Sequence, residues 1–336
     1  MVWTLLHSRL HQCLQKRFPE LKASRILVAV SGGQDSLCLL HLLNDLTKQW
    51  QWHLAVAHCD HRWPTDEGIA DHVQRLTQGY KLPYFQRDAQ DLPQTEAAAR
   101  HWRYQALTAI AIEEHFPVVV TGHTQSDRAE TLLFNLVRGS GSDGLQAMGW
   151  SRDLDGPKGD SNPEKHSPLK TKLIRPLLEI SRQETGNFCQ QQQLPVWEDV
   201  LNEKLTYRRN RIRGELIPYL QKHFNPQVEK NLAQTVELLT AEVAYLEQIT
   251  REIYQTLSQA DQKSLNRRLL SQQPLALQRR IIRQFLQSCQ SQDPNFDQIE
   301  QVVNLINAPN RSQTSSLPRQ GTVRVEGNFL RYLTVN

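Results

Sequence analysis

Cysteine pairs, long apolar runs and a strong excess of either charge are all missing from this sequence of 336 residues. The five cysteines, Cys13, Cys38, Cys59, Cys189 and Cys289, are widely separated and form no Cys-x-x-Cys motif. This spacing argues against an iron–sulfur cluster or a structural zinc site. An odd number of unpaired cysteines also fits a reducing cytosol.

The sequence contains no segment that is suited to a membrane. No apolar run approaches the roughly 20 residues that a spanning helix needs. The apolar residues 2–6 form too short a run, and no basic residues precede them, so a signal peptide is not expected. We therefore expect a soluble, cytoplasmic protein. The formal net charge of +4 permits a nucleic-acid partner but does not by itself indicate one.

Short apolar runs alternate with amphipathic helical patterns over the first two thirds of the chain. Strands are expected over residues 26–30, 53–58, 82–86, 117–122 and 172–178. Helices are expected over residues 2–18, 36–50, 66–79, 94–115, 125–138 and 181–193. Alternation of this kind predicts an α/β domain whose parallel sheet is covered by helices on both faces.

The last third of the chain, residues 216–336, has a different pattern. A helix of roughly 30 residues is expected to start at Asn225-Pro226, since Asn is a good cap and Pro suits the first turn. Two further helical patterns follow, and Gly327-Asn328 between two short apolar runs predicts a β-hairpin. A set of five arginines weakly suggests a nucleic-acid surface: Arg267, Arg268, Arg279, Arg280 and Arg283.

A glycine turn follows the first predicted strand and precedes a helix. Its sequence is Ser31-Gly32-Gly33-Gln34-Asp35-Ser36. Backbone amides at such a helix N-terminus attract an anion, and phosphate is the obvious one. No Lys follows the glycines, so the motif is not a Walker-type loop, and its spacing is not that of a dinucleotide fingerprint. An ordinary strand-to-helix turn is the simpler alternative.

Polar residues also gather at the ends of three predicted strands, at 31–33, 58–62 and 122–124. Because ligands bind at the carboxyl ends of parallel strands, these groups are expected to share one cleft. His58, Asp60 and His61 are metal-ligand types, but their spacing suits a zinc site poorly, and a role in shaping the pocket is preferred. The glycine-rich segment 138–144 follows a helix, so we interpret it as a loop, and residues 151–172 as a mobile loop.

Four arginines lie close together in residues 207–213. On a helix, Arg208, Arg209, Arg211 and Arg213 would spread around much of the circumference and grip a phosphate backbone. A solvated helix face explains the pattern equally well.

The loop resembles the pyrophosphate loop (PP-loop) of the N-type ATP pyrophosphatases. The motifs after it resemble the tRNA(Ile)-lysidine synthase family in their order and spacing. They are His58-x-Asp60-His61, Glu96-Ala97-Ala98-Ala99-Arg100-x-x-Arg103-Tyr104, Thr121-Gly122-His123-x-x-x-Asp127-x-x-Glu130-Thr131, Ile174-Arg175-Pro176-Leu177 and Arg209-Asn210-x-Ile212-Arg213. One segment departs from the family pattern, because Leu201 stands where a hydroxyl residue is usual.

The resemblance implies a Rossmann-like PP-loop catalytic domain over residues 1–215 and a helical linker with a small tRNA-binding domain over 216–336. It implies a ligase that binds tRNA(Ile) with a CAU anticodon. ATP would adenylate the C2 oxygen of the wobble cytidine at position 34 and release pyrophosphate. Free L-lysine would then displace AMP and form lysidine, which switches decoding from AUG to AUA. The oligomeric state stays open, and a homodimer is one option.

The resemblance also assigns roles to residues. The ATP phosphates would be bound by Ser31, Gly32, Gly33, Gln34, Asp35 and Ser36. Asp35, which has no proton to donate, would act through Mg²⁺. Arg100 or Arg103 would neutralise charge on the α-phosphate. His123, Asp127 and Glu130 would share one helix face, where the carboxylates bind the lysine ammonium and one group takes its proton. The alternative for these three residues is a capped, charged helix face. The tRNA would contact Arg208, Arg209, Arg211 and Arg213.

Two other interpretations remain open at this stage. The first is another adenylating enzyme of the PP-loop class, such as a tRNA thiolase or an amidotransferase-coupled synthetase. A thiolase needs a persulfide cysteine or a cysteine pair, and the second type needs a glutaminase, so the sequence favours neither. The second is a non-catalytic ATP-sensing module, which has no need of the acidic residues and the arginine pair.

Overall fold

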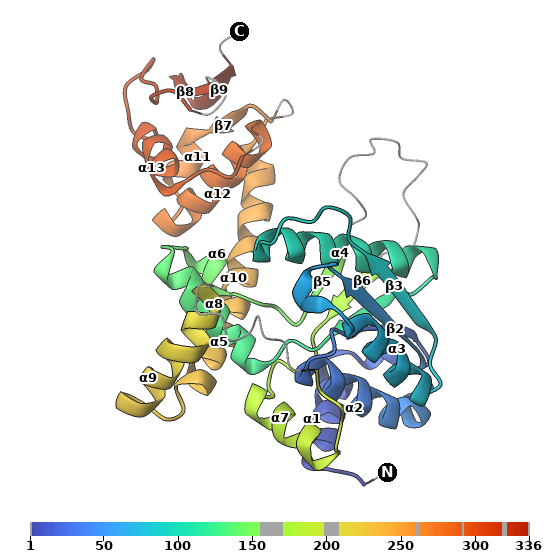
Figure 1. The fold of residues 1–336 in the computed structure, drawn as a ribbon. Helices are drawn as coiled ribbons and strands as arrows, with labels where there is room; N and C mark the ends of the chain where they lie inside the picture. The colour runs from blue at the N-terminus through green and yellow to red at the C-terminus, as the bar shows by residue number, and fades with distance from the viewer. Residues whose placement is uncertain are drawn as a thin grey trace. The chain divides into compact units, whose positions relative to one another are not determined.

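A computed structural model describes residues 2–154, 171–197, 208–259, 262–290, 292–317 and 321–334. The chain divides into two compact units, residues 1–239 and 240–336 (Figure 1). Most of the segment 151–172, which we expected to be a mobile loop, lies outside the described residues, and so does Leu201. None of the described helices is long and apolar enough to cross a membrane.

A mostly parallel sheet forms the centre of the first unit, with strand order β3-β2-β1-β4-β6-β5 among the described residues. The strands are β1 (Arg25–Ala29), β2 (His53–Asp60), β3 (Tyr84–Asp88), β4 (Val118–Thr121), β5 (Ser151–Leu154) and β6 (Thr171–Ile174). Only β5 pairs antiparallel to its neighbour among these described strands. The predicted α/β class and the parallel core of the sheet are therefore confirmed.

Helices cover both faces of this sheet. Besides the start of α10 (Val228–Leu257), the helices described in this unit are α1 (Leu5–Arg17), α2 (Gln34–Trp50), α3 (Ile69–Gly79), α4 (Glu96–Glu113), α5 (Gln125–Val137), α6 (Ser142–Leu145), α7 (Arg182–Gln191), α8 (Arg208–Arg211) and α9 (Ile217–His223), with short 3₁₀ turns at Pro19–Leu21 and Pro64–Asp66 and a π-helical segment at Ile212–Leu216. Ile26 and Val28 pack with α1, α2 and α7, whereas Leu27 packs with α4. Successive residues of β1 thus face opposite layers, as strand geometry requires.

Three boundaries differ from the sequence-based prediction. Residues 151–154 form the edge strand β5, which pairs with β6, although we expected a mobile loop there. Three of these four residues are exposed, so the segment lacks the apolar pattern of the inner strands. Helix α3 starts at Ile69 because Gly68, with φ +87°, precedes it, and α6 interrupts the expected glycine-rich loop.

The second unit combines helices with a small antiparallel sheet of order β7-β9-β8. Its elements are the end of α10 (Val228–Leu257), β7 (Ser264–Asn266), α11 (Arg267–Ser271), α12 (Leu275–Cys289), α13 (Phe296–Leu305), β8 (Gly321–Glu326) and β9 (Phe329–Thr334). The long helix has 30 residues and the hairpin turns at Gly327, where φ is +59°, so both predictions are confirmed. Strand β7 and helix α11 were not predicted, because both are too short to show a period.

Candidate functional site

The glycine turn between β1 and α2 is held by its own serines. Ser36 Oγ donates to the carbonyl of Gly33 at 2.8 Å and accepts from the amide of Ser31 at 3.2 Å. Gly32 has φ +89°, a conformation that favours glycine. Gly33 is the N-cap of α2, so the first amides of that helix have no partner within it. The predicted strand, turn and helix are confirmed, and their geometry is that of an anion site.

Gly122, at the end of β4, lies against this turn. A Cβ atom at Gly122 would be 2.8 Å from the carbonyl oxygen of Asp35 and 3.0 Å from the amide nitrogen of Ser36. Both are backbone atoms, so they have little freedom to move away. The close approach therefore requires glycine and fixes the position of the turn against the neighbouring strand.

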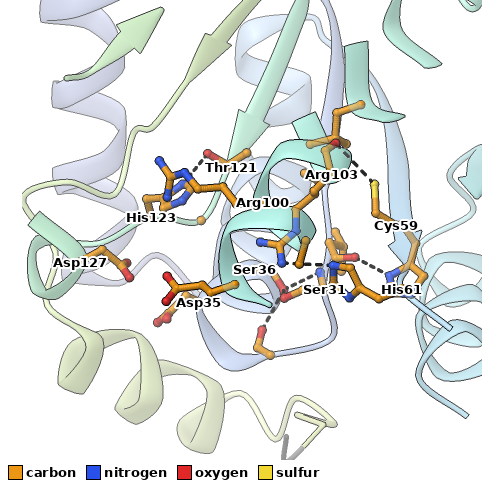
Figure 2. Close-up of a pocket in the computed structure, with 18 of the residues that line it drawn as sticks. Ser31, Asp35, Ser36, Cys59, His61, Arg100, Arg103, Thr121, His123 and Asp127 are labelled. Atoms are coloured by element: carbon orange, nitrogen blue, oxygen red, sulfur yellow. Dashed lines mark hydrogen bonds between the residues drawn. The ribbon is translucent and has the colours of Figure 1, made fainter. Parts of the chain in front are cut away.

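A cavity of about 420 Å³ opens at the carboxyl ends of β1, β2 and β4 (Figure 2). Most of the predicted site residues line it, namely Ser31, Gly33, Gln34, Asp35, Ser36, Arg100, Arg103, His123, Asp127, Glu130, Arg209 and Arg213. The polar ends of three strands therefore meet, as predicted. Gly32, Arg208 and Arg211 are not among the lining residues.

Asp35 is held by two residues of α7 that sequence reasoning missed. Arg182 Nη1 donates to Asp35 Oδ2 at 3.0 Å, and the Thr185 hydroxyl donates to Oδ1. Burial raises the pKa of Asp35, and Arg182 opposes this shift. The Gln34 amide donates to the Arg182 carbonyl at 2.7 Å, so this side chain braces α7. These partners lie about 150 residues from Asp35 in the chain, and no local pattern signals such a contact.

Asp127 both caps α5 and faces the cavity. Its Oδ2 accepts from the amide and hydroxyl of Thr124 at 2.7 and 2.8 Å, while Oδ1 lies 3.8 Å from Arg213 Nη2. Burial tends to raise the pKa of Asp127, but His123 and the bonds from Thr124 outweigh it, and the pKa is lowered. His123 precedes the N-cap Thr124 and lies outside the helix. The prediction that His123, Asp127 and Glu130 share one helix face is therefore wrong. All three nevertheless line the cavity.

Glu130 forms an ion pair with Arg213. Arg213 Nε and Nη2 donate to its two oxygens at 2.6 and 2.9 Å, and its side chain is 3% exposed. Burial raises the pKa of Glu130, and Arg213 opposes the shift. Arg209 lies 2.8 Å from Glu96. The predicted arginine cluster is thus divided, because Arg209 and Arg213 line the cavity whereas Arg208 and Arg211 are exposed.

The opposite wall combines arginines with aromatic rings. Arg100 and Arg103 enter from α4 (Figure 2), and Arg103 Nη2 lies 3.4 Å from His61 Nε2. The His61 ring stacks on Trp63 with 4.9 Å between centroids, and Trp102 lies 5.4 Å away. His58 is buried and its Nδ1 lies 2.8 Å from the carbonyl of Val30. This wall therefore offers cations beside stacked rings, which suits a nucleotide.

His123 makes the stability of this site sensitive to pH. Burial lowers its pKa, and nearby arginines add to the effect, so the native ring stays neutral when the unfolded one protonates. Stability should therefore fall as pH drops below about 6.5, by at most about 1.4 kcal/mol per pH unit. We expect thermal unfolding at pH 7.5, 6.5 and 5.5 to show a smaller decline for His123→Gln than for the unchanged protein. The two proteins share all other titrating groups. If their melting temperatures fall equally with pH, His123 is not the source of the loss of stability.

Comparison with known proteins gives consistent matches. A family model described as a PP-loop domain matches residues 5–220, and one described as the TilS substrate binding domain matches residues 265–330. A tRNA(Ile)-lysidine synthase of Synechocystis sp. is 85% identical and covers 99% of both chains. One of Nostoc sp. is 48% identical, covering 98% of this chain and 97% of its own.

Solved structures add a likeness of fold. The U34-tRNA thiolase NcsA of Methanococcus maripaludis, described with its [4Fe-4S] cluster, has a TM-score of 0.56 and 17% identity, covering 70% of this chain and 78% of its own. At that identity the likeness extends to the fold alone.

Proposed function

The chain belongs to the tRNA(Ile)-lysidine synthase family, and from that premise we propose how its cavity performs the ligation. The enzyme is an ATP-dependent ligase that forms lysidine on tRNA(Ile). In the proposed reaction, the C2 oxygen of the wobble cytidine attacks the α-phosphate of ATP and pyrophosphate leaves. The ε-amine of free L-lysine then attacks C2, and AMP leaves. We place this reaction in the cytoplasm.

The ATP phosphates are bound at the turn of residues 31–36. The observation that carries this assignment is the set of amides at the start of α2, fixed in place by Ser36 and by the close approach of Gly122. Arg100 and Arg103 supply positive charge from the opposite wall of the same cavity. They are suited to stabilise the charge that develops on the α-phosphate.

The donor set fits a magnesium ion that is carried by the phosphates. The described residues include no cluster of three or more His, Cys, Asp or Glu side chains that could hold a metal alone. Mg²⁺ in nucleotide sites usually takes only one or two carboxylates and completes its shell with phosphate and water. Asp35 lines the cavity and would hold it, and the ion would neutralise phosphate charge.

Lysine binds at the part of the cavity that Asp127 lines. The pKa of Asp127 is lowered, so the carboxylate is ionised and attracts an ammonium group. Glu130 contributes a second negative charge, although Arg213 engages it. His123 is neutral at physiological pH because burial lowers its pKa, so its ring can hydrogen-bond the attacking amine.

The tRNA contacts two regions of the chain. We assign the exposed Arg208 and Arg211 to its phosphates, with residues 216–336 as the linker and tRNA-binding domain. The Arg211–Glu215 pair is exposed and separated by 3.6 Å, so it is a weak competitor. Arg209 and Arg213, which line the cavity, are left to contact the anticodon region.

Replacing both exposed arginines, Arg208→Gln and Arg211→Gln, is expected to weaken tRNA binding without changing the KM for lysine. The slope of log affinity against log salt should fall by about 0.7 to 0.9 for each phosphate that the variant no longer neutralises. Filter binding between 50 and 200 mM salt measures both quantities. Arg87→Gln, on the exposed edge of β3, is the matched control. A slope equal to that of the control would place the phosphate-binding residues elsewhere.

The experiment that tests the whole assignment is pyrophosphate release from labelled ATP, with and without tRNA(Ile) bearing a CAU anticodon, and with and without labelled lysine. We expect release to require the tRNA, and lysine to enter the tRNA afterwards. If ATP is cleaved to AMP while lysine never enters the tRNA, the substrate assignment fails and the loop assignment survives.

A further inference from the structure

The first half of α10 contacts α5 on both sides of Asp127. Ser126 donates its hydroxyl hydrogen to Glu229, and Arg128 Nη2 donates to Glu237 Oε2 at 2.9 Å. Positions eight apart lie on one stripe of a helix, so the two glutamates share one face of α10. Both bonds join residues that immediately flank Asp127. The first turn of α5 is therefore held from α10 at two points.

Further hydrogen bonds link the Ser126–Glu229 contact to Asp35. Ser126 Oγ, which donates to Glu229, also accepts from the backbone amide of Arg182 at 2.9 Å. The side chain of Arg182 in turn donates to Asp35. Ser126 is 6% exposed, so water competes little for these bonds. A chain of three hydrogen bonds thus connects Glu229 to the carboxylate at the PP-loop.

The contact at Glu237 holds a buried cation. Arg128 is 2% exposed, and Glu237 is the acidic partner that the described residues provide for it. The Arg128 Nε donates to the carbonyl of Met148, a residue that lines the cavity, at 3.1 Å. Glu237 also accepts from Trp150 Nε1 at 2.8 Å and from Arg17 Nη2 at 2.9 Å. A buried cation with so few alternatives depends strongly on its partner.

We propose that Glu229 and Glu237 are positioning residues for the two halves of the ligation. Glu237 acts through Arg128 and sets the place of Asp127, and with it the lysine step. Glu229 acts through Ser126 and Arg182 and sets the place of Asp35, and with it the adenylation step. This inference rests on the proposed function, since it takes from there the roles of Asp35 and Asp127.

The test compares two substitutions that keep shape and remove charge. Glu237→Gln is expected to raise the KM for lysine about tenfold, since small displacements of a binding group have effects of this order, with tRNA-dependent pyrophosphate release changed less than about twofold. Glu229→Gln is expected to do the reverse, slowing pyrophosphate release about tenfold and leaving the KM for lysine unchanged. Glu237→Asp keeps the charge, so its KM for lysine should lie between those of Glu237→Gln and the unchanged protein.

Two controls separate positioning from loss of structure. Glu242→Gln changes an exposed glutamate farther along α10, and Glu20→Gln changes an exposed glutamate far from α10 in sequence. Both should keep the kinetic constants of the unchanged protein. Melting temperatures of all variants report on folding. If Glu237→Gln does not fold, the test is the KM for lysine of Glu237→Asp, which should still exceed that of the unchanged protein.

A lower kcat with an unchanged KM in both glutamine variants, in step with their melting temperatures, would mean a structural role and overturn the inference. Failure of the unchanged protein to attach lysine to the tRNA would instead overturn the proposed function.

Discussion

Replacing Asp35 with asparagine is expected to reduce tRNA-dependent pyrophosphate release by at least about a thousandfold, because in the proposed reaction this carboxylate would hold the Mg²⁺ that neutralises phosphate charge. An asparagine at this position can still accept from Arg182 through its oxygen and donate to the Thr185 hydroxyl through its amide nitrogen. Loss of activity should therefore come from the missing charge rather than from a displaced loop.

The same variant should lose little stability. Burial raises the pKa of Asp35, which means that the native environment disfavours the charged form, so a neutral amide costs less there than at most ion-paired sites. Pyrophosphate release and thermal unfolding, measured side by side, test both statements. Asp71→Asn, at an exposed position of α3, is the control. A residual rate within tenfold of the unchanged protein would remove Asp35 from the reaction.

Replacing Gly122 with alanine is expected to damage both folding and ATP binding. The added Cβ atom would lie 2.8 to 3.0 Å from three backbone atoms of Asp35 and Ser36, and real Cβ contacts are essentially never that short. Either the turn or β4 must shift. Overpacking of this kind typically costs about 1–3 kcal/mol. Because the shifted atoms belong to the turn that we propose binds the ATP phosphates, we also expect the KM for ATP to rise more than about tenfold.

Gly79→Ala provides the matched control for this prediction. A Cβ atom at Gly79 would meet no atom within 4 Å, and its backbone has no positive φ. This variant should keep its KM for ATP. Denaturant unfolding and ATP-dependence of pyrophosphate release are the measurements. If Gly122→Ala matches Gly79→Ala in both, the turn is not fixed by the end of β4.

The fold was predictable from the sequence where a segment has a clear hydrophobic pattern. Residues 26–28 are fully buried on both faces, and a continuous apolar run marks such a strand plainly. The edge strand β5 has no such run, because its exposed Arg152 and Asp153 look like loop residues. Short elements such as β7 and α11 also stayed hidden, since three to five residues are too few to display a period.

The candidate site was predictable where its residues follow strand ends. Ser31, Asp60 and His123 each follow a strand or end one, and all line the cavity. The partners of those residues were not predictable in the same way. Arg182 reaches Asp35 from α7, and Glu237 reaches Arg128 from α10. These contacts depend on how helices pack across the sheet, which neither spacing nor residue type reveals.

The Glu130–Arg213 pair has a consequence for the proposed binding of free lysine. Arg213 is tethered to the same chain, so its guanidinium is present beside Glu130 at a high effective concentration, in the millimolar range or above. An incoming ammonium group must displace this internal cation to reach Glu130. In the proposed site, Arg213 therefore competes with the amino acid and raises the lysine concentration at which an ammonium group reaches Glu130.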